Sequence, residues 1–258
     1  MSRRELPDLG LRPLTARSVA LTALLGSHPP QLPARALVAL GSHFGIAEGA
    51  MRTALSRMVV AGELEASEGQ YLLGTRLLQR QAAQDAGLRP PDEPWDGSWR
   101  FAIVTTPRRA IADRRAFRAQ MAEHRMGELR PDTWLRPANI PRPPALDGVL
   151  VVQGAIGEEP AADLVGRLWD LGEIAASARS LARLADEACG WLDSGDPGVL
   201  RDTFLLSVAT VRFLRHEPQL PSSVVGTPWP PNDLRASYES LRRGHLDLMA
   251  SFLATTSS

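Results

Sequence analysis

The chain has 258 residues and no formal net charge, because 29 arginines balance 29 acids. This length predicts two or three compact domains. The single cysteine, Cys189, excludes an internal disulfide and a cysteine-rich zinc site and fits a reducing cytoplasm. We expect a soluble cytoplasmic protein with no membrane contact, because the N-terminus lacks a long apolar run and the apolar stretch at residues 203–214 is short and contains Arg212.

The zero net charge conceals an uneven distribution. Residues 1–145 carry 20 arginines and 14 acids, whereas residues 146–258 carry 9 arginines and 15 acids. A nucleic-acid partner is therefore not excluded for the first half of the chain.

Residues 12–75 have the pattern of a winged helix-turn-helix domain, with a helix from Thr15 to Gly26 and a second helix after Pro33. A tight turn at residues 44–46 leads to a third helix over residues 50–60. Alternating residues 64–73 around Glu68-Gly69 predict a two-stranded wing. This order of elements indicates a DNA-binding domain.

The third helix is the expected recognition helix. Its apolar residues Met51, Leu55, Met58 and Val59 share one face, and the other face carries Arg52, Thr53, Ser56 and Arg57. That polar face is either an ordinary solvated surface or the surface that reads double-stranded DNA, and the turn and wing favour DNA. Further DNA candidates are Gln70 and Tyr71 on the wing, where Tyr71 could instead pack in the core, and Arg17 and Arg35 as phosphate ligands.

The middle of the chain predicts a small α+β domain. Residues 76–94 form a linker helix and a proline-rich break. Residues 95–168 then alternate between types of element, which suggests a ferredoxin-like unit. We expect strands at 99–105 and 148–153, helices at 108–124 and 161–168, an extended segment at 127–135 and a proline-rich loop at 137–144.

Residues 169–258 predict a mostly helical C-terminal domain. Apolar residues recur at helical spacing in residues 175–192, Pro197 opens a helix that ends near residue 216, and Asn232 begins a last helix. The fold class is therefore multidomain α+β.

A dense basic cluster lies in the central domain and comprises Arg108, Arg109, Arg114, Arg115 and Arg118. It is either a solvated helix face paired with Asp113 and Glu123 or a site for the phosphates of a coenzyme A thioester or of flanking DNA. The six tryptophans fill cores and interfaces, or one or two of them line an acyl pocket, for which Trp134 is our candidate.

Catalysis and metal binding have little support in the sequence. The five histidines are scattered, and no phosphate-binding loop, dinucleotide fingerprint or nucleophile elbow occurs. The strand that begins at Trp99 ends in Val104-Thr105-Thr106-Pro107, which lacks the aspartate that a metal-dependent nuclease of ferredoxin-like fold would need. We expect no catalytic residue, no metal and no cofactor.

Several segments in this order resemble the phenylacetic-acid degradation repressor (PaaX) family of bacterial transcriptional regulators. The matching segments are residues 51–58, 95–101, 114–115, 127–129, 134–137, 168–171 and 228–230. The loop at 107–109 is more basic than the family pattern, and residues 174–184 are alanine-rich and short.

The resemblance implies a DNA-binding homodimer whose central domain is similar to a CRISPR-associated nuclease fold. It also implies that an acyl-CoA, phenylacetyl-CoA or a related compound, relieves repression of a catabolic operon. We therefore expect a repressor of a double-stranded DNA operator, not an enzyme. The alternative is a metal-dependent nucleic-acid-processing enzyme that uses the ferredoxin-like domain.

Overall fold

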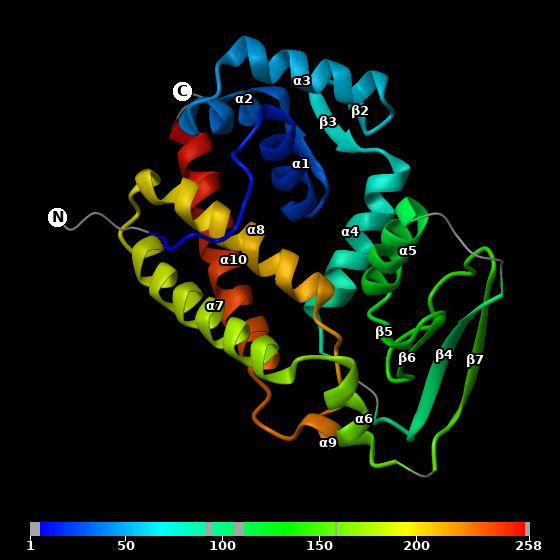
Figure 1. The fold of residues 1–258 in the computed structure, drawn as a ribbon. Coiled ribbons are helices and arrows are strands. Elements are labelled where there is room, and N and C mark those ends of the chain that lie inside the picture. The colour runs from blue at the N-terminus through cyan, green and yellow to red at the C-terminus, as the bar shows by residue number, and fades with distance from the viewer. Residues whose placement is uncertain (1–5, 91–93, 106–110, 158, 256–258) are drawn as a thin grey trace. The chain divides into compact units, whose positions relative to one another are not determined.

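The computed structural model describes residues 6–90, 94–105, 111–157 and 159–255 (Figure 1). The chain folds into two compact units. Unit 1 comprises Met1–Ala86, Leu184–Val211 and Ser237–Ser258, and unit 2 comprises Gly87–Arg183 and Arg212–Ala236. The C-terminal residues contribute to both units, and the domain boundaries given above remain a prediction. Each unit is described by itself.

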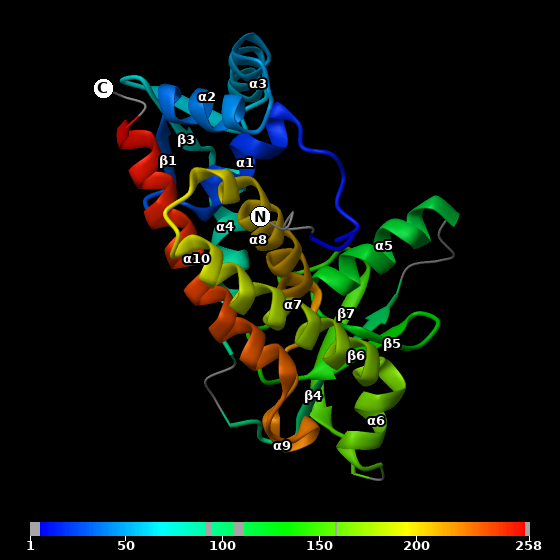
Figure 2. The same cartoon turned by 90° about the vertical axis from the view of Figure 1, so that its left-hand side faces the viewer.

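Unit 1 begins with the helices and the hairpin expected from the sequence, and Figure 2 shows the three helices together. One short strand, β1, was not predicted; it pairs with β3 to make an antiparallel sheet of order β1-β3-β2. The elements are α1 (Ala16–Gly26), β1 (Gln31–Pro33), α2 (Ala34–His43), α3 (Glu48–Val60), β2 (Leu64–Ser67), β3 (Gln70–Leu73) and α4 (Thr75–Leu88).

Two glycines fix the ends of α2 and α3. Gly45 has φ 82°, and the amide of Ile46 donates to the carbonyl of Gly41, which ends α2. Gly62 has φ 68°, and the amide of Glu63 donates to the carbonyl of Met58, which ends α3. Both arrangements are left-handed C-terminal caps that glycine adopts without a Cβ penalty. They set the direction of the chain before and after α3.

The rest of unit 1 is helical. It contains the C-terminal part of α7 (Leu171–Leu192), the short helix η1 (Pro197–Val199), the first part of α8 (Leu200–His216) and most of α10 (Pro230–Thr255). The Phe44 ring lies 5.1 Å from that of Phe204, and the His43 ring lies 4.9 Å from that of Phe252. These aromatic contacts attach the end of α2 to α8 and α10 within the unit.

Unit 2 is built on a four-stranded antiparallel sheet of order β5-β6-β4-β7. This is the strand order of a ferredoxin-like sheet, as predicted. The segment expected to be extended at 127–135 is two strands, because the chain turns at Asp132, which has φ 64°. The elements are β4 (Ser98–Val104), α5 (Ile111–Glu123), β5 (Gly127–Arg130), β6 (Thr133–Pro137), β7 (Val149–Ala155), α6 (Ala161–Leu168) and α9 (Ser222–Val225).

The two faces of this sheet carry different cores. On one face Ala102 and Trp134 pack against Met121 of α5, and on the other Trp99 and Leu135 pack against Leu164 of α6. A proline-rich loop connects β6 to β7, and α6 follows β7. A β-α-β-β-α-β order would place the second helix before the last strand. In unit 2 the second helix instead follows the last strand.

None of the helices in the described part of the chain is both long and apolar enough to cross a lipid bilayer.

Candidate nucleic-acid interface

Helix α3 has one buried face and one exposed face. Met51, Leu55 and Met58 are at most 2% exposed, so they anchor the helix in the core of unit 1. The predicted DNA-contacting side chains on the other face are all exposed; they are Arg52, Thr53, Ser56 and Arg57. Packing thus fixes which side chains the helix presents to solvent.

Close packing between α2 and α3 holds the helix in place. A Cβ atom at Gly41 would lie 2.5 Å from the Cε atom of Met51, so any larger residue there would require the end of the Met51 side chain to move. Helix α3 starts at Glu48, and its N-cap residue Ala47 provides no side-chain acceptor for the first backbone amides.

The exposed side chains of α3 differ in their own partners. The Nη2 atom of Arg52 lies 2.7 Å from the carboxylate of Glu48, one turn earlier, and Thr53 donates to the carbonyl of Gly49 at 2.7 Å. Arg57 forms no ion pair with any described residue. Arg57 is therefore available to a ligand, whereas Arg52 must first leave Glu48.

The wing residues are less accessible than those of α3. Gln70 and Tyr71 are half-buried on β3, and the side-chain oxygen of Gln70 is buried without a hydrogen-bond partner. Glu65 and Glu68 are exposed on β2 and the adjoining turn. These carboxylates would repel DNA phosphates, so any contact by this hairpin depends on its uncharged side chains.

Arg17 already has a protein partner. Its Nε atom lies 3.0 Å and its Nη2 atom 2.5 Å from the two carboxylate oxygens of Glu63, which connects α1 to the start of β2. The hydrogen bond from Arg17 is the main reason that the pKa of Glu63 lies below its ordinary value. Arg35, in the first turn of α2, is exposed. Both remain phosphate candidates.

The central basic cluster is only partly described. Arg108 and Arg109 lie outside the described residues, and Arg114 and Arg115 are exposed on α5. Arg118 pairs with Glu128 at 3.1 Å, not with Asp113 or Glu123. Glu123 instead pairs with Arg215 at 2.8 Å.

The predicted effector residue Trp134 is buried. Its indole packs edge-on against Phe117, with ring centroids 6.3 Å apart, in the core between the sheet and α5. A ligand could reach this indole only if the core opened.

The histidines and acids of the described residues form no cluster of three or more that could hold a metal ion. His245, for example, is buried, contacts the Thr203 hydroxyl at 2.8 Å, and has its pKa lowered by burial to about 4. This histidine is therefore neutral at pH 7 and packs in the helical core.

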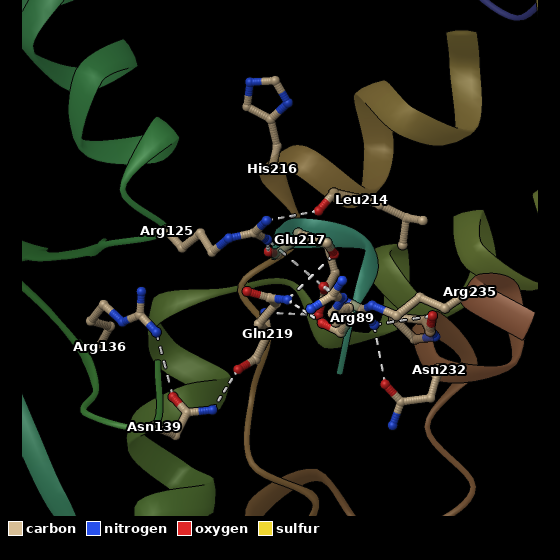
Figure 3. Close-up of polar contacts among 12 residues, drawn as sticks. Arg89, Arg125, Arg136, Asn139, Leu214, His216, Glu217, Gln219, Asn232 and Arg235 are labelled. Atoms are coloured by element: carbon tan, nitrogen blue, oxygen red, sulfur yellow. Dashed lines mark hydrogen bonds and ion pairs between the residues drawn. The ribbon is translucent and has the colours of Figure 1, made fainter. Parts of the chain in front are cut away.

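Sequence reasoning missed a polar group in unit 2, the Glu217 cluster (Figure 3). Its members are the half-buried Asn139 and the buried Arg125, Arg136, Glu217, Gln219 and Arg235. Both carboxylate oxygens of Glu217 are used: Oε1 accepts from the backbone amide of Gln219 at 2.8 Å, and Oε2 accepts from Arg235 at 2.5 Å. Arg125 donates to the backbone carbonyls of Leu214 and Glu217. The cluster therefore connects β-sheet, α8 and α10 residues of unit 2.

The only signal of this cluster in the sequence was Glu217 beside Pro218, which marked the end of a helix. Charged residues are rarely buried unless paired, and their partners here are distant in the sequence.

Two family models match the chain. One, described as PaaX-like protein, covers residues 15–77, and the other, described as the PaaX protein central Cas2-like domain, covers residues 92–143. The comparison with curated proteins gives no match. The chain is similar to a solved structure, the uncharacterized protein Rv0674 from Mycobacterium tuberculosis, with 36% identity over 93% of this chain and 99% of that one, and a TM-score of 0.68. The matched models and this similarity along almost the whole chain show that the protein belongs to the PaaX family.

Proposed function

We propose that the protein is a DNA-binding transcriptional regulator whose residues 15–77 act as a winged helix-turn-helix domain. The proposal rests on the two faces of α3. The apolar face is buried in the core, and the other face exposes Arg52, Thr53, Ser56 and Arg57. Arginine can bind guanine edges or phosphates, and serine and threonine can fix the register of a helix in the major groove. Membership of a family of regulators supports the same function.

The finer proposal is a homodimeric repressor of a catabolic operon. Two copies would present two α3 helices to the halves of a palindromic operator. An acyl-CoA such as phenylacetyl-CoA would favour a dimer geometry that no longer matches the half-site spacing. Arg114 and Arg115, which are exposed on α5, remain candidates for the effector's phosphates.

The test is selection of bound fragments from genomic DNA, followed by affinity measurements on the recovered fragments. The double variant Arg52→Ala, Arg57→Ala should lose roughly 2 to 6 kcal/mol of specific binding if each side chain contacts a base or a phosphate. A matched control is Arg179→Ala, Arg201→Ala, which removes the same charge from exposed positions on α7 and α8. Equal affinities of the two double variants would contradict the proposal.

Two further assays address the finer points. Incubating the protein with DNA and RNA plus Mg²⁺ or Mn²⁺ tests the nuclease alternative, because a regulator leaves both nucleic acids intact. A thermal-shift panel of acyl-CoAs tests the effector, since a ligand at about 100 times its Kd should stabilise the protein by about 2.7 kcal/mol.

A further inference from the structure

Two arginines lie side by side on adjacent strands in the sheet of unit 2. Arg100 of β4 and Arg136 of β6 are direct partners in the antiparallel ladder, so their side chains leave the same face of the sheet. The partner of Arg100 on the opposite side, in β7, is the uncharged Gln153. Like charges directly opposite each other destabilise a sheet. Neither arginine forms an ion pair with a carboxylate of the described residues.

Backbone carbonyls at the end of β6 and just after α5 accept hydrogen bonds from the Arg136 side chain. This side chain is only 1% exposed and donates to the backbone carbonyls of Pro137 at 3.0 Å and His124 at 3.3 Å. His124 follows the last residue of α5, where a positive charge is favoured by the helix dipole. Arg136 therefore has a structural role at the end of α5.

Arg100 has no comparable set of partners. One of its Nη atoms donates to the carbonyl of Ile140, but its Nε atom is buried and has no hydrogen-bond partner. A buried donor without an acceptor costs about 1 to 3 kcal/mol. A glutamine would avoid both this cost and the repulsion from Arg136, so stability alone does not explain the arginine.

A third arginine adds to the local positive charge. Arg142, in the loop between β6 and β7, is exposed and donates to the carbonyl of Val151 at 3.1 Å. Burial, and secondly the charge of Arg142, lower the pKa of Arg100, whereas Asp96 opposes this shift. Burial and then the charge of Arg100 lower the pKa of Arg136 to about 9. Burial and the neighbouring arginines thus outweigh the attraction of Asp96 for Arg100 and of Glu217 for Arg136.

We propose that Arg100 and Arg142 bind an oxyanion, namely a phosphate or carboxylate group of a small molecule. The buried Arg136, next to Arg100 in the sheet, would contribute positive charge without contacting the anion. Guanidinium groups bind such oxyanions through charge-assisted hydrogen bonds. A shift of the Arg100 side chain toward the anion would let the anion supply the acceptor that the buried Nε atom lacks. Arg142 is exposed and Arg100 is half-buried, so a small anion can approach them from solvent. We call Arg100, Arg136 and Arg142 the oxyanion site.

The oxyanion site would hold the effector of the regulator, and to that extent it rests on the proposed function. Anion binding, however, is measured without DNA. Failure of DNA binding would overturn the regulator and leave the anion result unaffected, whereas failure of anion binding would overturn only this site.

The experiment compares the wild-type chain with Arg100→Gln, Arg142→Gln and the control Arg130→Gln, an exposed arginine on β5. Thermal unfolding and calorimetry are measured in chloride, inorganic phosphate, benzoate and coenzyme A at equal ionic strength. At least one oxyanion should raise the Tm of the wild type and of Arg130→Gln. Arg100→Gln should bind that anion at least about tenfold more weakly, the loss expected for one charge-assisted hydrogen bond. Arg142→Gln should bind it several-fold more weakly.

The unliganded proteins provide an independent readout. In chloride, Arg100→Gln should unfold at the same temperature as the wild type or higher, because the repulsion and the unpaired donor are gone. If Arg100→Gln does not fold, Arg100→Lys and Arg142→Gln provide the test. Lysine keeps the charge but lacks the Nε donor, so both variants should bind the anion more weakly than the wild type.

A response to inorganic phosphate would identify free phosphate as a sufficient ligand. A response only to benzoate or coenzyme A would identify an anion carried by a larger molecule, and either result supports the site. The proposal is overturned if no oxyanion raises the Tm of the wild type above its value in chloride at equal ionic strength. It is also overturned if Arg100→Gln and Arg130→Gln bind the anion equally, or if only DNA stabilises the wild type.

Discussion

Glu217 and Arg235 form a buried ion pair, with 2.5 Å between the carboxylate Oε2 atom and the guanidinium Nη2 atom. The two side chains are 0% and 5% exposed, respectively. Such a pair stabilises a fold only when its other hydrogen bonds are satisfied. Here the second carboxylate oxygen accepts from the amide of Gln219, whereas the Nε atom of Arg235 is buried without a hydrogen-bond partner. Removing the negative charge would leave Arg125 and Arg235 buried without their common carboxylate.

We therefore expect Glu217→Gln to lower the free energy of unfolding by roughly 3 to 5 kcal/mol, the usual cost of breaking a buried ion pair from one side. Urea denaturation followed by tryptophan fluorescence measures this loss. The control is Glu239→Gln, whose carboxylate is half-exposed and pairs with Arg242; it should change stability by less than about 1 kcal/mol. Similar losses in both variants would contradict the importance assigned to burial.

Arg125 has an unfavourable backbone conformation at the end of α5. Its φ is 57°, and the hydrogen bonds from Arg125 to Ala122 and from Met126 to Met121 form a C-terminal cap in which glycine is usual. We expect Arg125→Ala to be less stable than Arg125→Gly by about 1 kcal/mol, because both variants lose the side-chain contacts but only alanine keeps the strain. Thermal unfolding of the two variants measures this difference. Equal stability would show that the backbone relaxes.

These two examples indicate what the sequence could and could not predict. The three N-terminal helices and the hairpin follow from apolar periodicity and from glycines at the turns, which act locally. Strand β1 has only three residues and a proline, so it carries no alternating pattern. The Glu217 cluster could not be predicted from the sequence, because Arg125 and Glu217 are 92 positions apart and their contact depends on the tertiary fold. The exposed face of α3 was predictable, but the pairing of Arg52 with Glu48 lowers its availability.

The ion pair of Arg17 and Glu63 predicts a pH dependence of stability. The hydrogen bond from Arg17 lowers the folded-state pKa of Glu63 below its ordinary value of 4.5. The stabilisation is therefore complete above about pH 4.5 and is lost as the pH falls through the lower folded-state value. In the Glu63→Gln variant, the decrease in unfolding free energy that comes from protonating Glu63 at low pH should be absent. Unfolding free energies from pH 3 to 7 measure it, and an unchanged slope below pH 4.5 would contradict the assignment.

Glu48 is expected to oppose DNA binding while stabilising α3. Its carboxylate holds Arg52 at 2.7 Å, and its negative charge lies in the first turn, near the positive end of the helix dipole. We expect Glu48→Gln to bind selected DNA fragments roughly 3- to 10-fold more tightly, because Arg52 is released and a charge that repels phosphates is removed. The same change should lower the unfolding free energy by roughly 0.3 to 1 kcal/mol.

Fluorescence anisotropy measures the affinity, and Asp186→Asn, an exposed position on α7, controls for the change in net charge. Most of the gain should vanish when Glu48→Gln is made together with Arg52→Ala, because the released guanidinium is then absent. The full gain in that double variant would show that Glu48 acts through its own charge and that Arg52 does not contact DNA.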